Sequence, residues 1–194
     1  MHIFTFLLLL SESFYPPAVE VRYFDIVHRD KVIGSLTATK TEDDNQIIYK
    51  NETFIRTRIV KEIEVNYLFE AMYINGELEN AEAIIKVNDE IRESTITCRE
   101  KPGYLVQLHQ DEEKWIDSEA IVYSSVMLTF EEPAVNDKSF SEKDGNEHQL
   151  MAMGEHTYKK INSKGQENSY YYEGGDLKWA KLDAGIINFE IRSK

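Results

Sequence analysis

The most informative stretch of the sequence is Ile63-Glu64-Val65-Asn66-Tyr67-Leu68-Phe69-Glu70-Ala71-Met72-Tyr73. Its odd-numbered residues are apolar or aromatic, whereas Glu64, Asn66 and Glu70 make most of the even-numbered positions polar. Side chains alternate between the two faces of a β-strand, so this pattern predicts a strand with one buried face. Asn75-Gly76 follows directly, and this dipeptide is the strongest short signal for a tight hairpin.

Similar segments occur on both sides of this strand and are separated by short turn sequences such as His28-Arg29-Asp30-Lys31 and Gly174-Gly175. We expect strands at residues 19–27, 32–39, 47–60, 78–87, 91–99, 104–109, 115–116, 150–161, 169–172, 177–182 and 186–191. Regular strands with short connections are typical of an antiparallel meander and not of βαβ units. A sheet of this size must curl to hide its apolar face. The sequence therefore predicts an all-β fold with one short helix, an antiparallel meander curled into an open half-barrel or a barrel.

Two segments lack the alternation. Residues 117–128 start with Asp117 and an acidic first turn, and they place Ile121, Ser125 and Leu128 at helical spacing. We expect the single helix there, ending before Pro133. Residues 136–147 are polar and are predicted to form an exposed loop.

The first residues of the sequence are apolar. Residues 2–10 form a short apolar run that is followed by Ser11-Glu12-Ser13, and small residues of this kind suit a cleavage site. The run is too short to cross a bilayer, which takes about 20 apolar residues. We therefore expect a signal peptide at residues 1–13 and one β domain at residues 14–194, in a periplasmic or secreted protein. The alternative is a buried first strand, because no Lys or Arg precedes the apolar run.

The composition excludes several classes of partner and site. The 194 residues carry a formal net charge of −13, which would repel nucleic acid and anionic lipid surfaces. The chain has a single cysteine, Cys98, so it forms no internal disulfide. Cys98 lies in a predicted strand without a histidine nearby, and we expect it to be buried and structural.

The sequence offers no convincing catalytic or metal site. His148 and His156 are eight residues apart and, on one continuous strand, would lie about 26 Å apart, so we expect two solvent-facing histidines. Glu131 and Glu132 form a carboxylate pair of the type used in glycoside cleavage, but neighbours on a strand point to opposite faces. We predict no catalytic residues, no metal and no cofactor.

Aromatic side chains recur on the predicted strands. Tyr67, Phe69 and Tyr73 share the apolar face of residues 63–73 and are the candidates for lining a ligand pocket. The alternative is that they only pack the core.

Three segments carry a resemblance to a known family. They are residues 24–36, Leu128-Thr129-Phe130-Glu131-Glu132-Pro133, and Tyr170-Tyr171-Tyr172-Glu173-Gly174-Gly175-Asp176-Leu177. With them the chain resembles a family of uncharacterised exported bacterial proteins. That family is similar in architecture to periplasmic lipoprotein carriers, whose curved sheet holds acyl chains against a covering helix. The resemblance implies a fold and assigns no functional residues.

Three hypotheses about function follow. The first is a non-enzymatic binding module of the cell envelope that holds an apolar or amphipathic ligand, such as a lipid, in the curved sheet. The second is a structural or interaction protein of the envelope, which predicts a filled interior and an exposed apolar patch or an unpaired strand edge. The third is a glycan-acting enzyme, which predicts two carboxyl groups facing each other across a cleft.

Overall fold

The computed structural model describes residues 16–58, 62–110, 112–133, 137–183 and 188–194. The predicted signal peptide, residues 1–13, lies outside these ranges, within which the chain is almost entirely β-structure. The strands are β1 (Ala18–His28), β2 (Lys31–Asp43), β3 (Gln46–Arg58), β4 (Glu62–Ile74), β5 (Glu77–Val87), β6 (Glu90–Glu100), β7 (Gly103–Leu108), β8 (Glu112–Ile116), β9 (Lys138–Ser141), β10 (Asn146–Gly154), β11 (Thr157–Ile161), β12 (Glu167–Glu173), β13 (Asp176–Asp183) and β14 (Asn188–Ser193). A short 3-10 helix, η1 (Ser125–Thr129), lies between β8 and β9.

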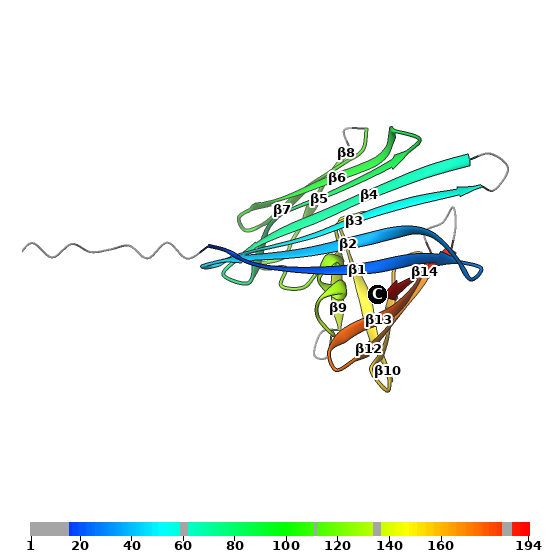
Figure 1. The fold of residues 1–194 in the computed structure, drawn as a ribbon. Helices are drawn as coiled ribbons and strands as arrows, with labels where there is room; N and C mark the ends of the chain where they lie inside the picture. The colour runs from blue at the N-terminus through cyan, green and yellow to red at the C-terminus, as the bar shows by residue number, and fades with distance from the viewer. Residues whose placement is uncertain (1–15, 59–61, 111, 134–136, 184–187) are drawn as a thin grey trace, which may run out of the picture.

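All described strands belong to one antiparallel sheet (Figure 1). β1 to β8 form a meander of mostly long strands, and β9 to β14 form a second meander of shorter strands. The two meanders join where residues 24–27 of β1 pair with residues 190–193 of β14. The sheet ends at β8 and β9, which do not pair with each other in the described structure, so it is curled but not closed. The predicted all-β antiparallel meander is confirmed in its open form.

The turns that the sequence predicted connect these strands. Arg29 and Asp30 join β1 to β2, and Asn75 and Gly76 join β4 to β5, all four with positive φ. Left-handed backbone of this kind is what a two-residue hairpin of type I′ requires, and Asn and Gly adopt it at low cost. These turns set the register of the hairpins that they connect.

Alternation along β4 also matches the expectation. Val65, Ala71 and Tyr73 are buried on the inner face of the sheet. The register with β5 shifts by one residue between Met72 and Tyr73, where Tyr73 lies opposite Leu78. A bulge of this type keeps the buried face continuous while it increases the local twist of the sheet.

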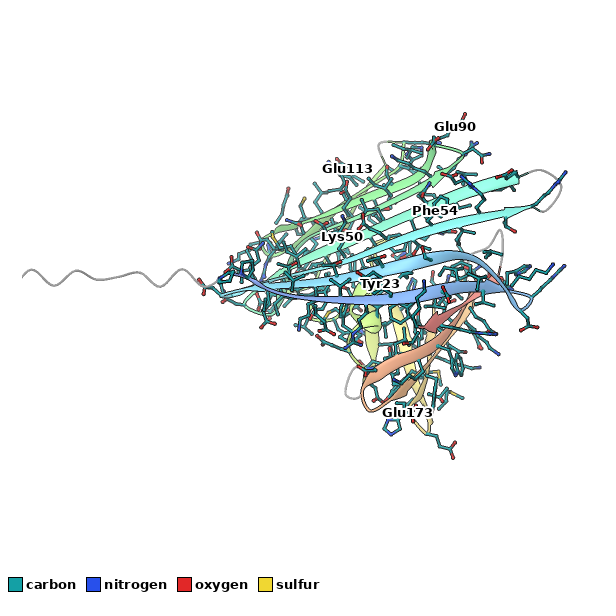
Figure 2. The ribbon with its side chains drawn as sticks, viewed as in Figure 1. Tyr23, Lys50, Phe54, Glu90, Glu113 and Glu173 are labelled. Atoms are coloured by element: carbon teal, nitrogen blue, oxygen red, sulfur yellow. The ribbon has the colours of Figure 1, made fainter. Side chains whose placement is uncertain are left out.

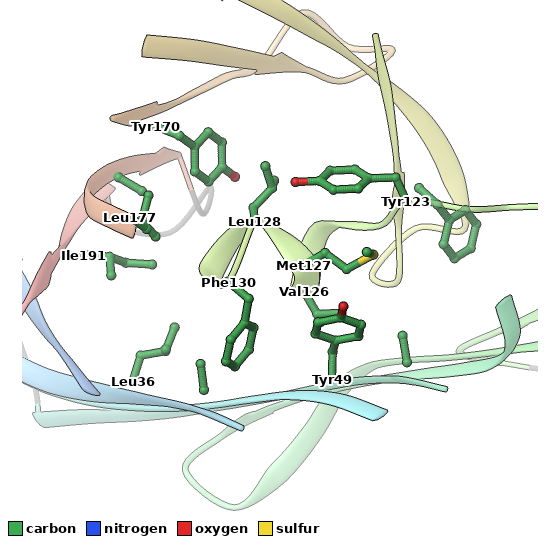
Figure 3. Close-up of a cluster of buried hydrophobic side chains, with 14 of the residues drawn as sticks. Leu36, Tyr49, Tyr123, Val126, Met127, Leu128, Phe130, Tyr170, Leu177 and Ile191 are labelled. Carbon is green, nitrogen blue, oxygen red and sulfur yellow. The ribbon is translucent and has the colours of Figure 1, made fainter. Parts of the chain in front are cut away.

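The helix η1 lies inside the curl, between the two meanders. Figure 3 shows Leu36 and Tyr49 of the long strands on one side of it, Tyr170 on the opposite side and Ile191 beside it. All four side chains are buried, as is Leu128 of η1. A one-sheet fold has no second layer to cover its inner face, so the connection between its two ends fills part of the interior.

The outer face of the sheet carries polar and aromatic side chains, among them Tyr23, Lys50 and Phe54 (Figure 2). Cys98 also lies on this face and is exposed, so the expectation of a buried cysteine was wrong. Its neighbour Thr97 is fully buried, and alternation along β6 then turns Cys98 outwards.

The expected helix at residues 117–128 was wrong in its extent, because only η1 is helical. Residues 117–124 are held against the sheet by hydrogen bonds to both backbone groups of Ile121. Leu78 N–H donates to the carbonyl of Ile121, and the hydroxyl of Tyr104 accepts from Ile121 N–H at 3.0 Å. Because the sheet satisfies these backbone groups, the segment does not need a helix to do so.

Two further expectations about the second half of the chain were wrong. In the predicted loop at residues 136–147, residue 136 lies outside the described ranges, but residues 138–141 form β9, and Phe140 and Glu142 are buried. The predicted strand at residues 150–161 is a hairpin, because Gly154, Glu155 and His156 have positive φ and reverse the chain between β10 and β11.

Candidate binding cavity

A cavity of about 620 Å³ lies inside the curl, between the sheet and η1. Its apolar lining comes from both meanders and from η1, and it includes Leu36, Tyr67, Phe69, Leu128, Leu177 and Phe189. Ligand pockets in proteins typically occupy about 300–1,000 Å³ and are mostly apolar with a few polar groups. The size and lining of this cavity are therefore those of a small-molecule site.

The structure places the three predicted lining residues in two different environments. Tyr67 and Phe69 line the cavity and lie against each other with ring centroids 6.1 Å apart. Tyr73 lies farther along β4 and is buried in the core, where its ring meets Tyr49 edge-on at 5.9 Å. The inner face of β4 borders the cavity at Tyr67 and Phe69 and the filled core at Tyr73. The three aromatic residues therefore share one face of the strand but do not line one pocket.

One wall of the cavity carries a buried ammonium group. Lys160 of β11 is 7% exposed, and its Nζ donates to the hydroxyl of Ser125, the first residue of η1, at 2.7 Å. Burial lowers the pKa of Lys160, against the attraction of the carboxylates of Glu142 and Asp144. In the described part of the chain its direct partner is a neutral hydroxyl and no carboxylate forms an ion pair with it.

Glu142 is the most deeply buried carboxyl group on this wall and is 2% exposed. Its Oε1 accepts from the backbone N–H of Val126 at 3.2 Å. Burial raises its pKa, and hydrogen bonds together with the charge of Lys160 act in the opposite direction. The net effect favours the neutral carboxyl group more than in water.

Asp144 and His148 form the third polar feature of the wall. Asp144 Oδ2 lies 2.9 Å from Nε2 of His148, and Asp144 Oδ1 accepts from the N–H of Asn146 at 3.2 Å. Burial acts to raise the pKa of Asp144, but these hydrogen bonds and the imidazole outweigh it and hold the pKa at about 2. Nδ1 of His148 is buried and has no hydrogen-bond partner in the described residues.

The same region brings the two ends of the sheet together. Lys114 of β8 donates to the carbonyl of Asp144 at 2.7 Å and to Oδ1 of Asn146 at 2.6 Å. Thr95 of β6 donates to the carbonyl of Lys143, whose Nζ lies 3.2 Å from Glu93. These side-chain hydrogen bonds connect the two ends of the sheet, where backbone pairing of β8 with β9 would have closed a barrel.

The histidine and glutamate pairs in the sequence do not form joint sites. His148 is buried at the cavity wall, so the expectation that both histidines face solvent was wrong for it, whereas His156 is exposed and contacts Glu132 at 2.8 Å. Glu132 also accepts from Tyr158, and Glu131 accepts from Tyr49. Among the described residues no group of three or more His, Cys, Asp or Glu side chains is arranged to hold a metal ion.

Lys160, Glu142, Asp144 and His148 together form a polar wall of the cavity. The sequence did not predict this wall, because residues 136–147 were expected to form an exposed loop. One usable signal was present in β11, where Tyr158 and Lys160 are two residues apart and must share a face. A lysine on the aromatic face of a strand is uncommon in a core unless it has a role there. For Glu142 the local sequence gives no such signal, because its burial depends on contacts with η1.

No described helix has the length and apolar character needed to cross a bilayer.

Comparisons with known proteins assign the chain to a family and add a distant structural likeness. The model of DUF6134, a domain of unknown function, matches residues 24–194. A solved structure, described as a beta-barrel-like protein of domain of unknown function DUF1849 from Brucella abortus, is 13% identical with a TM-score of 0.49. The match covers 92% of this chain and 96% of that one. No curated protein matches the sequence.

Proposed function

We propose a binding function for this chain, which belongs to the DUF6134 family, a family of unknown function. The protein is a non-enzymatic binding module that holds an apolar or amphipathic small molecule, such as a lipid, inside its curled sheet. The observation that carries the proposal is the cavity of about 620 Å³, lined by Tyr67 and Phe69 on one wall and by Leu177 and Phe189 on the other.

The cavity supports binding over the hypothesis of a structural protein with a filled interior. Protein interiors are close-packed, and the apolar side chains around an empty volume forgo the contacts that would stabilise them. An apolar ligand restores these contacts and keeps water away from Leu36, Phe69 and Phe189. The glycan-acting enzyme has less support, because Glu131 and Glu132 each accept a hydrogen bond from a tyrosine of a different strand.

The proposal is tested by filling the cavity with a larger side chain. Thr53 of β3 lines the cavity beside Tyr67, its partner in the β3–β4 ladder, so Thr53→Trp places an indole in the volume that the ligand needs. We expect the variant to bind the neutral, apolar fluorescent probe N-phenyl-1-naphthylamine about tenfold more weakly than the unmodified protein, which corresponds to about 1.4 kcal/mol. The measurement is a fluorescence titration.

The matched control is Glu52→Trp, which adds the same indole one residue earlier in β3. Glu52 is exposed on the outer face and pairs with Lys50 at 3.0 Å. The control is expected to bind the probe like the unmodified protein. Equal affinity in all three proteins would locate the probe outside the cavity and refute the proposed site.

We also propose that the protein is exported to the periplasm or secreted, a proposal supported by the apolar run at residues 2–10. Fractionation of cells that express residues 1–194 tests this directly. Recovery of a shortened protein from the periplasm or medium would support it, and recovery of the intact chain from the cytoplasm would contradict it.

A further inference from the structure

The ammonium group of Lys160 is the feature of the cavity that the fold itself does not explain. The side chain is 7% exposed and donates to the Ser125 hydroxyl, and no carboxylate of the described chain forms an ion pair with it. Taking a charged group out of water is costly unless a partner of opposite charge is supplied. A core that needed only packing would place an apolar side chain at this position of β11.

The carboxyl groups of Asp144, Glu142 and Glu93, which line the same cavity, do not provide that partner. Asp144 is engaged by the imidazole of His148 and by the N–H of Asn146. Glu142 accepts from Val126 N–H, and its burial favours the neutral form of the carboxyl group. Glu93, a further carboxylate at the cavity, pairs with Lys143 at 3.2 Å.

Lys160 lies in the wall of the cavity, so its charge is close to the apolar volume. β11 pairs with β10 on one side and with β12 on the other. Glu142 and His148, on the β9–β10 side of β11, and Leu177 and Phe189, on β13 and β14 beyond β12, line the same cavity, which also has polar side chains such as Asn168 on the β12 side. Lys160 therefore lies between the buried carboxyl and imidazole groups and this apolar part of the lining.

We infer that the cavity binds a single-chain amphiphile with an anionic head group, and that Lys160 and the Ser125 hydroxyl bind the head while the apolar walls enclose the chain. This inference rests on the proposed function and specifies the ligand class for the same cavity. The chemistry is shared by a fatty acid, whose head is a carboxylate, and by a lysophosphatidic acid, whose head is a phosphate monoester. A carboxylate or phosphate oxygen would give Lys160 the charge-assisted hydrogen bond that it lacks.

The test compares ligands that differ only in the head group. Palmitate, palmitoyl lysophosphatidic acid and hexadecanol compete with N-phenyl-1-naphthylamine for the unmodified protein, Lys160→Met and Lys159→Met. Lys159 is the matched control, because it precedes Lys160 on the same strand, faces the other side of the sheet and pairs with Glu167 at 2.6 Å. Replacing a buried unpaired charge by an apolar side chain of similar length is expected to leave the melting temperature of Lys160→Met unchanged or raised, so its fold can be verified independently of binding.

We expect the unmodified protein to bind at least one of the two anionic amphiphiles about tenfold more tightly than hexadecanol, and Lys160→Met to lose this preference while keeping its affinity for hexadecanol. Lys159→Met is expected to behave like the unmodified protein. The stronger of the two acids identifies the head group as a carboxylate or a phosphate.

Equal affinity for hexadecanol and both acids, or a preference that survives in Lys160→Met, would overturn the head-group inference and leave the proposed cavity in place. If neither the alcohol nor the acids displace the probe from the unmodified protein, a single-chain amphiphile is excluded as the ligand, whereas the proposed binding function is refuted only by equal probe affinity in the unmodified protein, Thr53→Trp and Glu52→Trp.

Discussion

At the scale of single residues, the inner face of the sheet combines two kinds of environment. Tyr73 lies in a filled core and packs edge-on against Tyr49, whereas Tyr67 and Phe69 of the same strand line a cavity. The aromatic alternation of residues 63–73 predicted that all three face inwards. It could not distinguish core from cavity, because the difference depends on whether η1 or empty volume lies opposite each position.

The lowered pKa of Asp144 predicts how the stability of the protein depends on pH. This pKa of about 2 lies below the usual 3.8, so the carboxylate stabilises the folded state above pH 4, and this contribution is lost as the pH falls from about 4 to about 2. The shift corresponds to roughly 2 kcal/mol, and screening at a side chain that is 36% exposed reduces it to about 1 kcal/mol. We expect Asp144→Asn to lower the free energy of unfolding by that amount at pH 7.

Denaturant unfolding measured between pH 7 and pH 2 tests this expectation. The difference between Asp144→Asn and the unmodified protein should shrink towards zero as the pH approaches 2. Asp30→Asn is the control, because Asp30 is 94% exposed in the β1–β2 turn and Asn also tolerates its positive φ. A constant difference for Asp144→Asn over the whole pH range would contradict the lowered pKa of Asp144.

At the scale of elements, η1 depends on the sheet that surrounds it. A helix of five residues is not stable alone, since few internal hydrogen bonds offset its ordering. The buried hydroxyl of Tyr172 in β12 donates to the carbonyl of Leu128 at 2.7 Å and so ties the second meander to the helix. The connection between β8 and β9 is thereby fixed inside the curl.

Removing that hydroxyl should destabilise the protein. Tyr172→Phe leaves the buried carbonyl of Leu128 without this donor, and we expect a loss of about 1–3 kcal/mol in the free energy of unfolding. The control is Tyr171→Phe, whose ring stacks on Trp179 at 5.8 Å and keeps that contact after the substitution. Chemical denaturation measures both; equal stabilities of the two variants would show that the contact with η1 contributes little.

The elements that could be predicted from the sequence are those whose information is local. Alternation and turn residues such as Asn75-Gly76 determine the long hairpins, and these were predicted with nearly correct bounds. The hairpin of β10 and β11 was missed although Gly154 lies in its turn, because the next residue, Glu155, is uncommon at positive φ and is not a typical turn residue. The helix was overextended because the backbone partners of residues 117–124 lie on distant strands.

At the scale of the whole molecule, the topology explains why a cavity is present. β1 and β14 pair in the middle of the sheet, so its two ends, β8 and β9, are joined by the segment that carries η1. That segment enters the curl and covers part of the inner face. The rest of the inner face, around Tyr67, Phe69 and Lys160, borders the cavity instead of a second layer.

The sequence indicated that such a sheet must curl, and it left open whether the sheet closes. The answer depends on contacts between residues far apart in the chain. Lys114 of β8 bonds to the β9–β10 turn through Asp144 and Asn146, where backbone pairing of the two end strands would have sealed a barrel. Neither β8 nor the turn carries a local pattern that reveals this contact.

A crystal structure of the protein with palmitate that carries a bromine on its terminal carbon shows whether the cavity holds an acyl chain. We expect one anomalous bromine peak inside the curl, among the apolar side chains that include Phe69, Leu177 and Phe189, with the carboxylate near Lys160. Bromine peaks only on the outer face of the sheet, or an interior occupied by repacked side chains, would contradict this expectation.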